Sequence, residues 1–357
     1  MRRNLRVLAL TRYGELGASS RLRTFQYLPD WYQSDIDVTV IPLFEDEILS
    51  ARYKIGRYGL LTIMQCFSKR IAAMLFRKNI DLIWIEKEAL PWWPLWFELI
   101  LLRGTPFILD YDDATFHNYD KHRSALVRWI YSSRLDKLMN RSSLVLGGSP
   151  YLVERAKKSG AKKIELLPTV IDLKRYPINK IKKSVSEIPR IVWIGSPSTA
   201  QYLNILHEPL KKLVAKKHFI LRIIGADIHL PGVPIELINW TEESEVSNIA
   251  ECDIGIMPLR DSAWEKGKCG YKLIQYMACH LPVVASPVGV NTSIVENGIN
   301  GYLANDAEEW VRALLQLIEN KLLCEKMGAA GRLKVEAEYS LQVSSKKLIN
   351  LILNLVE

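Results

Sequence analysis

Cysteine is scarce in this sequence, and no two cysteines form a CxxC pair. The 357 residues include five cysteines, an odd number. Disulfide frameworks use cysteines in pairs and structural zinc sites use closely spaced ones, so neither is expected here. The pattern is typical of a protein in a reducing compartment, which favours a cytoplasmic location.

Long apolar runs are also missing. The nearest approach is the stretch 89–102, which is interrupted by two prolines and a glutamate and falls short of the roughly 18 apolar residues that a membrane span needs. The first residues, MRRNLRVLALTRYGE, have too short an apolar stretch for a signal peptide and predict a strand instead. We therefore expect a cytoplasmic protein without a membrane-spanning helix.

Several catalytic and binding signatures are absent. The loop after the first predicted strand lacks GxGxxG, which argues against a nicotinamide cofactor. The sequence shows no nucleophile elbow and no histidine pair at metal spacing, and it carries no recognisable nucleic-acid-binding motif. We expect no cofactor, no metal site and no nucleic-acid partner.

Positive charge, by contrast, is in excess. Lysine and arginine total 48 against 39 aspartates and glutamates, a formal net charge of +9. This balance favours acidic partners such as nucleotides, phosphorylated lipids or an anionic membrane face. The remaining composition is that of an ordinary globular protein, and the length suits two domains.

Short apolar runs predict the strands of two parallel sheets. The runs of the first half are 5–10, 38–41, 82–85, 107–110, 143–146 and 164–167, and those of the second half are 191–195, 219–225, 235–239, 253–257, 282–286 and 301–304. They are continuous rather than alternating, as in strands covered on both faces, and helical periodicity lies between most of them. The alternation predicts an α/β fold of two Rossmann-like, doubly wound domains.

The boundary between the domains is expected where periodicity is lost. Lysines, serines and prolines cluster between residues 167 and 190. We predict an N-terminal domain over 1–170, a linker over 171–189, a C-terminal domain over 190–337 and a final helix over 338–357 that packs back on the N-terminal domain. Such domains bind ligands at the carboxyl ends of their strands, so a cleft between them is the expected site.

Two lysines stand near a predicted helix start that follows the run 253–257. Lys268 and Lys272 are four residues apart and would share one helix face, while Gly267 and Gly270 allow the backbone to approach a bulky group. A helix start already carries partial positive charge, so added cations favour an anion there. We predict a diphosphate at this position; solvated surface lysines are the alternative.

The sequence around these lysines resembles a known family. KLIQYMACHLPVVASPVGVN, IVENGINGYLA and MGAAGRLKVEAEYS are similar to the C-terminal domain of the group 1 glycosyltransferases, which have the GT-B architecture. GGSPYLVERAKKSGAKKIELLPTVIDLKRY and GASSRLRTFQYLP resemble the segment that enters the family's linker and its first glycine-containing loop. The resemblance implies two Rossmann-like domains facing a central cleft, and sugar transfer with retention and without a metal.

The resemblance also implies roles for individual residues. Gln275 stands where a family glutamate binds the nucleotide ribose, and Gly267 stands where another touches the donor sugar, with Glu265 as a nearby substitute. Lys268 and Lys272 are then the diphosphate contacts and catalytic candidates. The donor-binding residues would be Gly195, Ser196, Ser198, Thr199, Glu265, Gly267, Gly270, Tyr271, Gln275, Gly17 and Arg21.

An acidic segment, ILDYDDATFHNYD, follows the run 107–110. Asp110 and Asp112 form an Asp-x-Asp, the pattern by which metal-dependent GT-A transferases hold a divalent ion. It falls in the half without the nucleotide-type motif, so the resemblance assigns Asp112, Asp113 and His117 to the acceptor side as catalytic candidates. The alternative is that Asp113 caps the next helix and His117 packs locally.

Residues 51–79 combine cations with apolar side chains at helical spacing, and Trp92, Trp93 and Trp96 follow. This pattern suits a membrane interface, although a core helix with a solvated basic face has the same signature.

The expected function is transfer of a sugar from a nucleotide diphosphate sugar to an acceptor hydroxyl, in bacterial cell-surface polysaccharide biosynthesis. The acceptor would be a lipid-linked saccharide or glycan, and the protein would lie peripherally on the inner face of the cytoplasmic membrane. Two alternatives remain open. One is a nucleotide-sugar epimerase or phosphorylase, and the other is an inactive nucleotide-sugar-binding protein, since Gly267 and Gln275 replace both motif glutamates.

Overall fold

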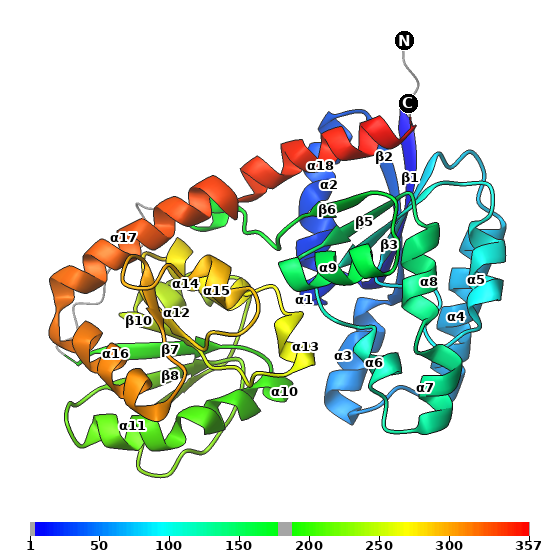
Figure 1. Ribbon diagram of the computed structural model, residues 1–357. Coiled ribbons are helices and arrows are strands. Elements are labelled where there is room, and N and C mark those ends of the chain that lie inside the picture. Colours follow the sequence, from blue (N-terminus) through cyan, green and yellow to red (C-terminus); the bar gives the residue numbers. More distant parts are fainter. Residues whose placement is uncertain (1–3, 178–187, 357) are drawn as a thin grey trace. The chain divides into compact units, whose positions relative to one another are not determined.

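A computed structural model describes residues 4–177 and 188–356, which separate into two compact units (Figure 1). Within the described residues, unit 1 consists of 4–169, 267–269 and 344–356, and unit 2 consists of 170–266 and 270–343. Residues 178–187 of the predicted linker lie outside the described residues. The predicted domain boundaries stay a prediction.

Unit 1 contains a six-stranded parallel sheet in the order β2-β1-β3-β4-β5-β6. Its strands are β1 (Leu5–Tyr13), β2 (Ile36–Phe44), β3 (Leu82–Glu86), β4 (Phe107–Tyr111), β5 (Leu144–Gly147) and β6 (Ile164–Leu166). β3, β4 and β5 are buried along their whole length, which explains their uninterrupted apolar sequences. The strand order reverses between β1 and β3, and ligands of such sheets bind outside the carboxyl ends at that point.

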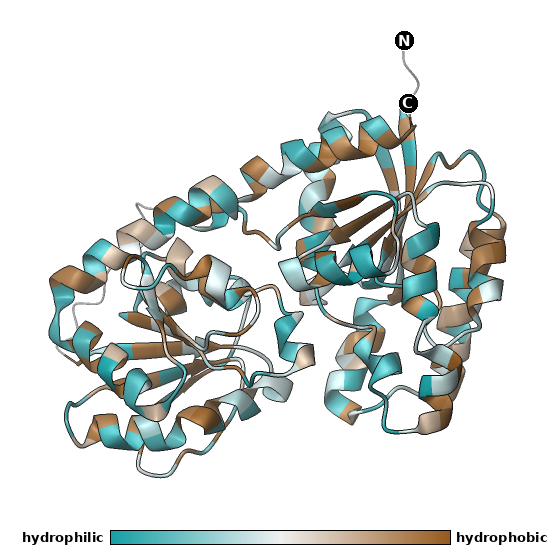
Figure 2. Ribbon diagram, viewed as in Figure 1, coloured by the Kyte–Doolittle hydropathy of each residue, from teal (hydrophilic) through white to brown (hydrophobic). Residues whose placement is uncertain are grey.

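Helices cover this sheet and connect its strands. They are α1 (Ala18–Arg23), η1 (Phe25–Tyr27), α2 (Leu28–Gln33), α3 (Asp46–Ile55), α4 (Leu60–Leu75), α5 (Leu95–Leu102), α6 (His117–Asp120), α7 (Ala125–Tyr131), α8 (Arg134–Arg141) and α9 (Pro150–Lys158). Much of the sheet is coloured as hydrophobic in Figure 2, and so is much of α5.

Unit 2 repeats the architecture with the order β12-β11-β10-β7-β8-β9, again all parallel. Its strands are β7 (Arg190–Ile194), β8 (Ile220–Ile224), β9 (Ile235–Ile238), β10 (Ile254–Met257), β11 (Val283–Ala285) and β12 (Gly301–Leu303). The order reverses between β7 and β10. The loops that leave the carboxyl ends of these two strands are therefore the expected ligand-binding position of this unit.

The helical elements of the second half are η2 (Leu173–Arg175), α10 (Pro197–Ala200), η4 (Gln201–Leu206), α11 (His207–Val214), α12 (Glu245–Ala250), α13 (Ala263–Lys266), α14 (Tyr271–Ala278), α15 (Asn291–Ile294), α16 (Ala307–Glu319), α17 (Lys321–Glu338) and α18 (Leu341–Val356). Residues 344–356 of α18 belong to unit 1. None of the helices within the described ranges is long and apolar enough to cross a membrane.

The predicted α/β fold class, two doubly wound parallel sheets, is confirmed. Each predicted apolar run coincides with a strand to within a few residues.

Candidate functional site

A partly buried cluster of charged side chains lies at the carboxyl ends of β3 and β4 in unit 1. Lys87, the residue after β3, places its Nζ 3.0 Å from Asp112 Oδ1 and 3.2 Å from Asp113 Oδ2. Ser19, in α1, has its hydroxyl within hydrogen-bonding reach of Asp112 and 2.8 Å from Glu86 Oε1. These residues are distant in sequence, and the strand order at the reversal point brings them together.

The backbone of Lys87 is strained. Its φ is 66°, in the left-handed region, which costs a non-glycine residue roughly 1–2 kcal/mol. In this conformation its N–H donates to Asp110 O at 2.8 Å, while the ammonium reaches both carboxylates. Strain of this kind persists where surrounding contacts impose it and is concentrated at functional sites. Sequence analysis missed Lys87, although a charged run directly after a buried strand was a usable signal.

The two carboxylates of this cluster differ in their surroundings. Asp112 is contacted by both Lys87 and Ser19, and burial is outweighed by these partners, so the pKa of Asp112 is lowered. Burial raises the pKa of Asp113, and the Asp112 carboxylate raises it too, against the opposing effect of Lys87. Asp113 Oδ1 accepts no hydrogen bond from any described residue. Asp112 Oδ1 also accepts no hydrogen bond but is paired with Lys87, so Asp113 Oδ1 is the buried carboxylate oxygen of this cluster that has neither kind of partner within the described residues.

His117 is held inside unit 1 by both ring nitrogens. Nδ1 lies 2.7 Å from Asp120 Oδ1 and Nε2 lies 2.9 Å from the Tyr151 hydroxyl. This is the local packing that we considered as the alternative, and a catalytic role for His117 stays a prediction. Asp113 does not cap the following helix, because the N-cap position of α6 is Phe116.

The Asp-x-Asp pattern does not present two carboxylates to one ion. Asp110 is fully buried and forms a two-pronged ion pair with Arg23, whose Nε lies 2.9 Å from Asp110 Oδ2. Asp112 is bound instead by Lys87 and Ser19. Among the residues that the structure describes, no three His, Cys, Asp or Glu side chains are grouped so that they could hold a metal.

The basic loop after β1 has mixed surroundings. Gly17 is the N-cap of α1, and a Cβ at this position would lie 2.3 Å from the Tyr13 Cβ, so the loop requires glycine. Arg21 donates to Glu15 O at 3.0 Å. Arg23 is buried and is therefore a core residue of unit 1.

In unit 2 the loop after β7 presents hydroxyls. Ser196 and Ser198 are exposed, with their Oγ atoms 2.9 Å apart, and Thr199 donates to Ser196 O at 2.9 Å. A Cβ at Gly195 would lie 2.6 Å from the Trp193 ring and 2.8 Å from Thr199 Oγ1, so only glycine fits. These predicted residues do lie at the carboxyl end of β7, one side of the reversal point.

Lys272 lies at the same edge of unit 2. It is in the first turn of α14, and its Nζ is 5.3 Å from the centroid of the Trp193 ring at the end of β7. This distance is within the range of a cation–π contact. The contact brings the start of α14 next to the strand that leads into Gly195 and Ser196. An ammonium, a helix N-terminus and hydroxyls thus occur together, which is a suitable setting for phosphate.

The helix predicted to start near Lys268 begins three residues later. α14 begins at Tyr271, because Gly270 adopts a φ of 66° and interrupts the helix. Gly267 and Lys268 belong to unit 1, where a Cβ at Gly267 would lie 2.5 Å from the Ala114 Cβ. The two lysines therefore do not share one helix face. Their common role in diphosphate binding stays a prediction.

The residues at or near the two motif-glutamate positions are buried and partnered. Tyr202 donates to Glu265 Oε1 at 2.6 Å, and the Ser262 hydroxyl also contacts Glu265. Gln275 is buried, with its Nε2 3.5 Å from the Tyr176 hydroxyl. Tyr271 packs against the core of unit 2. Donor binding by these side chains stays a prediction.

Part of the chain matches a known family. Residues 188–320 match the family described as "Glycosyl transferases group 1". A glycosyltransferase of Methanocaldococcus jannaschii described as uncharacterized is 30% identical over 118 residues, 32% of this chain and 31% of that relative. A probable sucrose-phosphate synthase of Thermosipho melanesiensis is 32% identical over 83 residues, 23% of this chain and 19% of that relative. The chain thus spans less than a third of the length of either curated relative.

A crystal structure extends the likeness to nearly all of the chain. HepE of Anabaena, solved in complex with UDP and glucose, superposes with a TM-score of 0.72 at 15% identity, over 98% of this chain and 100% of that chain. At this identity the likeness shows the fold alone. The family recognised from the sequence is nevertheless confirmed by residues 188–320. Residues 188–320 thus match the group 1 glycosyltransferases, and the two doubly wound parallel sheets form a GT-B fold.

Proposed function

We propose that the protein transfers a sugar from a nucleotide diphosphate sugar to an acceptor hydroxyl, with retention and without a metal. The observation that carries the proposal is the first turn of α14, where Lys272 lies beside Trp193 at the carboxyl end of β7, inside the stretch that matches the family. As the bond between the sugar and the diphosphate breaks, negative charge grows on the leaving group. An ammonium and helix N–H groups stabilise that charge.

A uridine diphosphate sugar is the first donor to test. The support is the Anabaena structure with UDP and glucose, which covers almost the whole fold. In unit 2 the hydroxyls of Ser196 and Ser198 are exposed and suit phosphate oxygens as donors. Glu265, already bound by Tyr202, is our candidate for the sugar side.

The acceptor hydroxyl is proposed to bind in unit 1, at Asp113. Its Oδ1 has no partner within the described part of the chain, so it can accept the hydrogen bond of a hydroxyl that loses its proton as it attacks the sugar. Lys87 positions this carboxylate. We propose a lipid-linked saccharide of a bacterial cell-surface polysaccharide as the acceptor, with the protein peripheral on the inner face of the cytoplasmic membrane.

As the pH is lowered, the rate of transfer is expected to fall at a higher pH than it would if the base were an aspartate with an ordinary pKa. Asp113 acts when ionised, and its pKa is raised above 3.8 by burial, so activity is full above the raised pKa and lost as the pH falls through it. Lys87→Met removes the cation that lowers this pKa and shifts the acid limb of the pH–rate profile further upward. Lys121→Met, at an exposed site, should leave the limb unchanged. An acid limb that Lys87→Met does not move would contradict the role of Asp113.

Incubation with uridine diphosphate sugars and extracted lipid-linked saccharides tests the transfer directly. Release of the nucleoside diphosphate should require the acceptor and should be unaffected by EDTA, since no metal takes part in the proposed reaction. Sugar rearrangement without acceptor would identify an epimerase, the open alternative of the same fold. Loss of transfer in EDTA would indicate that the reaction depends on a metal ion.

An inactive nucleotide-sugar-binding protein is the second candidate. It is favoured by Gly267 and Gln275 at the positions of the two motif glutamates. In the same incubation it would bind the nucleotide sugar, detected by thermal shift, without releasing any diphosphate.

A further inference from the structure

Large apolar side chains are exposed on three helices of unit 1. We define the apolar face as Leu60, Leu61 and Met64 of α4, Trp96 and Ile100 of α5, and Leu126, Trp129 and Ile130 of α7. Trp129 is 82% exposed and Leu61 is 75% exposed. Single exposed apolar residues are normal, but a contiguous set marks an interaction surface.

Aromatic contacts connect the three helices. The ring of Phe67 in α4 lies 5.9 Å from Trp93, which stacks on Phe97 of α5 at 5.3 Å. Trp92 lies 6.0 Å from Tyr131 of α7, and the Tyr131 hydroxyl donates to Trp92 O at 2.9 Å. All three helices lie on the right-hand side of unit 1 in Figure 1. Their exposed side chains therefore belong to one region of the unit.

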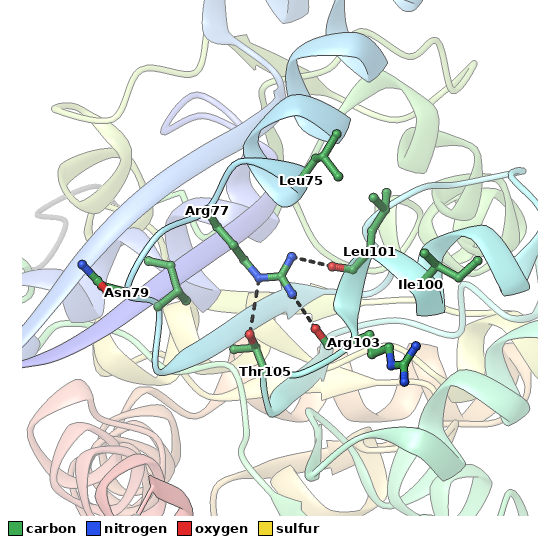
Figure 3. A pocket seen from close by; sticks show the side chains of 8 residues that line it. Leu75, Arg77, Asn79, Ile100, Leu101, Arg103 and Thr105 are labelled. Carbon is green, nitrogen blue, oxygen red and sulfur yellow. Dashed lines mark hydrogen bonds between the residues drawn. The ribbon is translucent and has the colours of Figure 1, made fainter.

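The ends of α4 and α5 are joined by Arg77, as Figure 3 shows. Its guanidinium donates to Leu101 O at 2.5 Å and to Arg103 O at 2.9 Å. A pocket beside this contact is bordered by the exposed side chains of Leu75 and Ile100. Arg77 fixes α4 and α5 to each other, so their part of the apolar face is formed before any partner binds. This lowers the entropy lost on binding.

The charges around the apolar face are mainly positive. The segments 51–79 and 121–135 contain no aspartate or glutamate, and Glu98 of α5 is buried and paired with Arg134. The exposed cations of these segments and of the end of α5 are Lys54, Arg57, Lys69, Lys78, Arg103, Lys121, Arg123 and Arg128. Of these, Lys69 pairs with the exposed Glu45. Apolar side chains, tryptophans and an excess of cations together match an anionic lipid surface.

We propose that the apolar face docks unit 1 on an anionic phospholipid bilayer. Trp96 and Trp129 would lie at the level of the lipid headgroups, where amphipathic rings are favoured, and the surrounding cations would contact lipid phosphates. The docking surface rests on the proposed function, which places the protein at the membrane. It goes further by naming the residues that contact the bilayer and by including α5 and α7 beside the segment 51–79. It requires neither donor nor acceptor.

Flotation with lipid vesicles tests the surface. The whole chain should float with vesicles that contain phosphatidylglycerol, remain behind with purely neutral vesicles, and dissociate at high salt. Trp96→Ser combined with Trp129→Ser should lower the partition coefficient by about tenfold. Arg57→Glu, Lys78→Glu and Arg123→Glu should each lower it by about fivefold or more. The matched control is Leu322→Ser combined with Leu333→Ser, two exposed leucines of α17 in unit 2.

Two results would overturn the inference. One is equal flotation of the wild type and the double tryptophan variant; the other is light scattering that reveals a dimer which this variant dissociates, since the occupant would then be a second copy of the chain. Circular dichroism checks that the variants are folded. The vesicles contain no acceptor and no nucleotide sugar, so flotation does not depend on transfer. A chain that floats here but transfers no sugar in the incubation with uridine diphosphate sugars and lipid-linked saccharides would count against glycosyl transfer and leave the docking surface intact.

Discussion

Lys272→Ala is expected to weaken binding of uridine diphosphate by roughly 10- to 100-fold, since hydrogen bonds to charged groups contribute about 1.5–3 kcal/mol. The Lys272 ammonium lies beside the Trp193 ring at the start of α14. There it can reach a phosphate bound at the helix N–H groups. Isothermal titration calorimetry measures the affinity without any acceptor, so the result does not depend on knowing the complete reaction.

Two matched variants make this measurement specific. Lys212→Ala removes an exposed lysine of α11 in the same unit and should leave the affinity unchanged. Lys272→Arg keeps the charge and should retain most of the binding, which separates charge from the packing of the lysine stem on Trp193. Unchanged affinity in Lys272→Ala would remove α14 from the donor site and with it the main support for the proposed function.

Arg23→Ala is expected to lower the free energy of unfolding by about 3–5 kcal/mol, the usual cost of leaving one partner of a buried ion pair alone. Arg23 and Asp110 are both buried, and Arg23 also donates to Leu167 O at 2.8 Å. Burial raises the pKa of Asp110 from 3.8 to about 6, against the opposing charge of Arg23. Without Arg23 this pKa rises further.

The loss of stability in Arg23→Ala should depend on pH in a defined direction. In the wild type the folded state holds the Asp110 proton more tightly than the unfolded state, so its contribution is present below 3.8 and is lost as the pH rises through about 6. In Arg23→Ala the loss continues up to the higher pKa of the unpaired Asp110. The variant is therefore most destabilised at neutral pH and partly recovers on mild acidification. Urea denaturation at several pH values measures this effect.

Comparison variants separate the ion pair from general damage. Arg141→Ala removes an exposed arginine of α8 and should change stability by less than about 0.5 kcal/mol. Arg23→Met combined with Asp110→Leu removes both charges and should recover much of the loss. A double variant as unstable as Arg23→Ala would mean that packing, and not the unpaired carboxylate, explains the effect.

The strands were predictable because burial on both faces leaves an uninterrupted apolar run. β3, for example, reads Leu-Ile-Trp-Ile before its first charged residue. The start of α14 was not predictable from the sequence, because the helical periodicity extends back through Gly270. Only the left-handed backbone torsion of Gly270 prevents the helix from starting earlier. Local propensity gives no account of a single left-handed residue whose conformation is set by its neighbours in space.

The candidate site was likewise predictable only in part. Sequence analysis identified Asp112 and Asp113 but grouped Asp110 with them, since neighbouring letters cannot show that Arg23, 87 residues earlier, binds Asp110. Lys87 was missed for a related reason: its role depends on the strand order that places β3 beside β4. Residue type and spacing indicate the chemistry, whereas the partners of each charge depend on long-range topology.

The final helix has a consequence for how the protein is made. Unit 1 includes residues 344–356, and in this part of α18 Leu348 and Ile352 are completely buried and Lys347 donates to Leu166 O at 3.0 Å. During translation the strands of unit 1 leave the ribosome early, but the helix that completes their cover is synthesised only after all of unit 2. Unit 1 therefore keeps an apolar surface uncovered until all of unit 2 has been synthesised, and chaperones have most to protect during this interval.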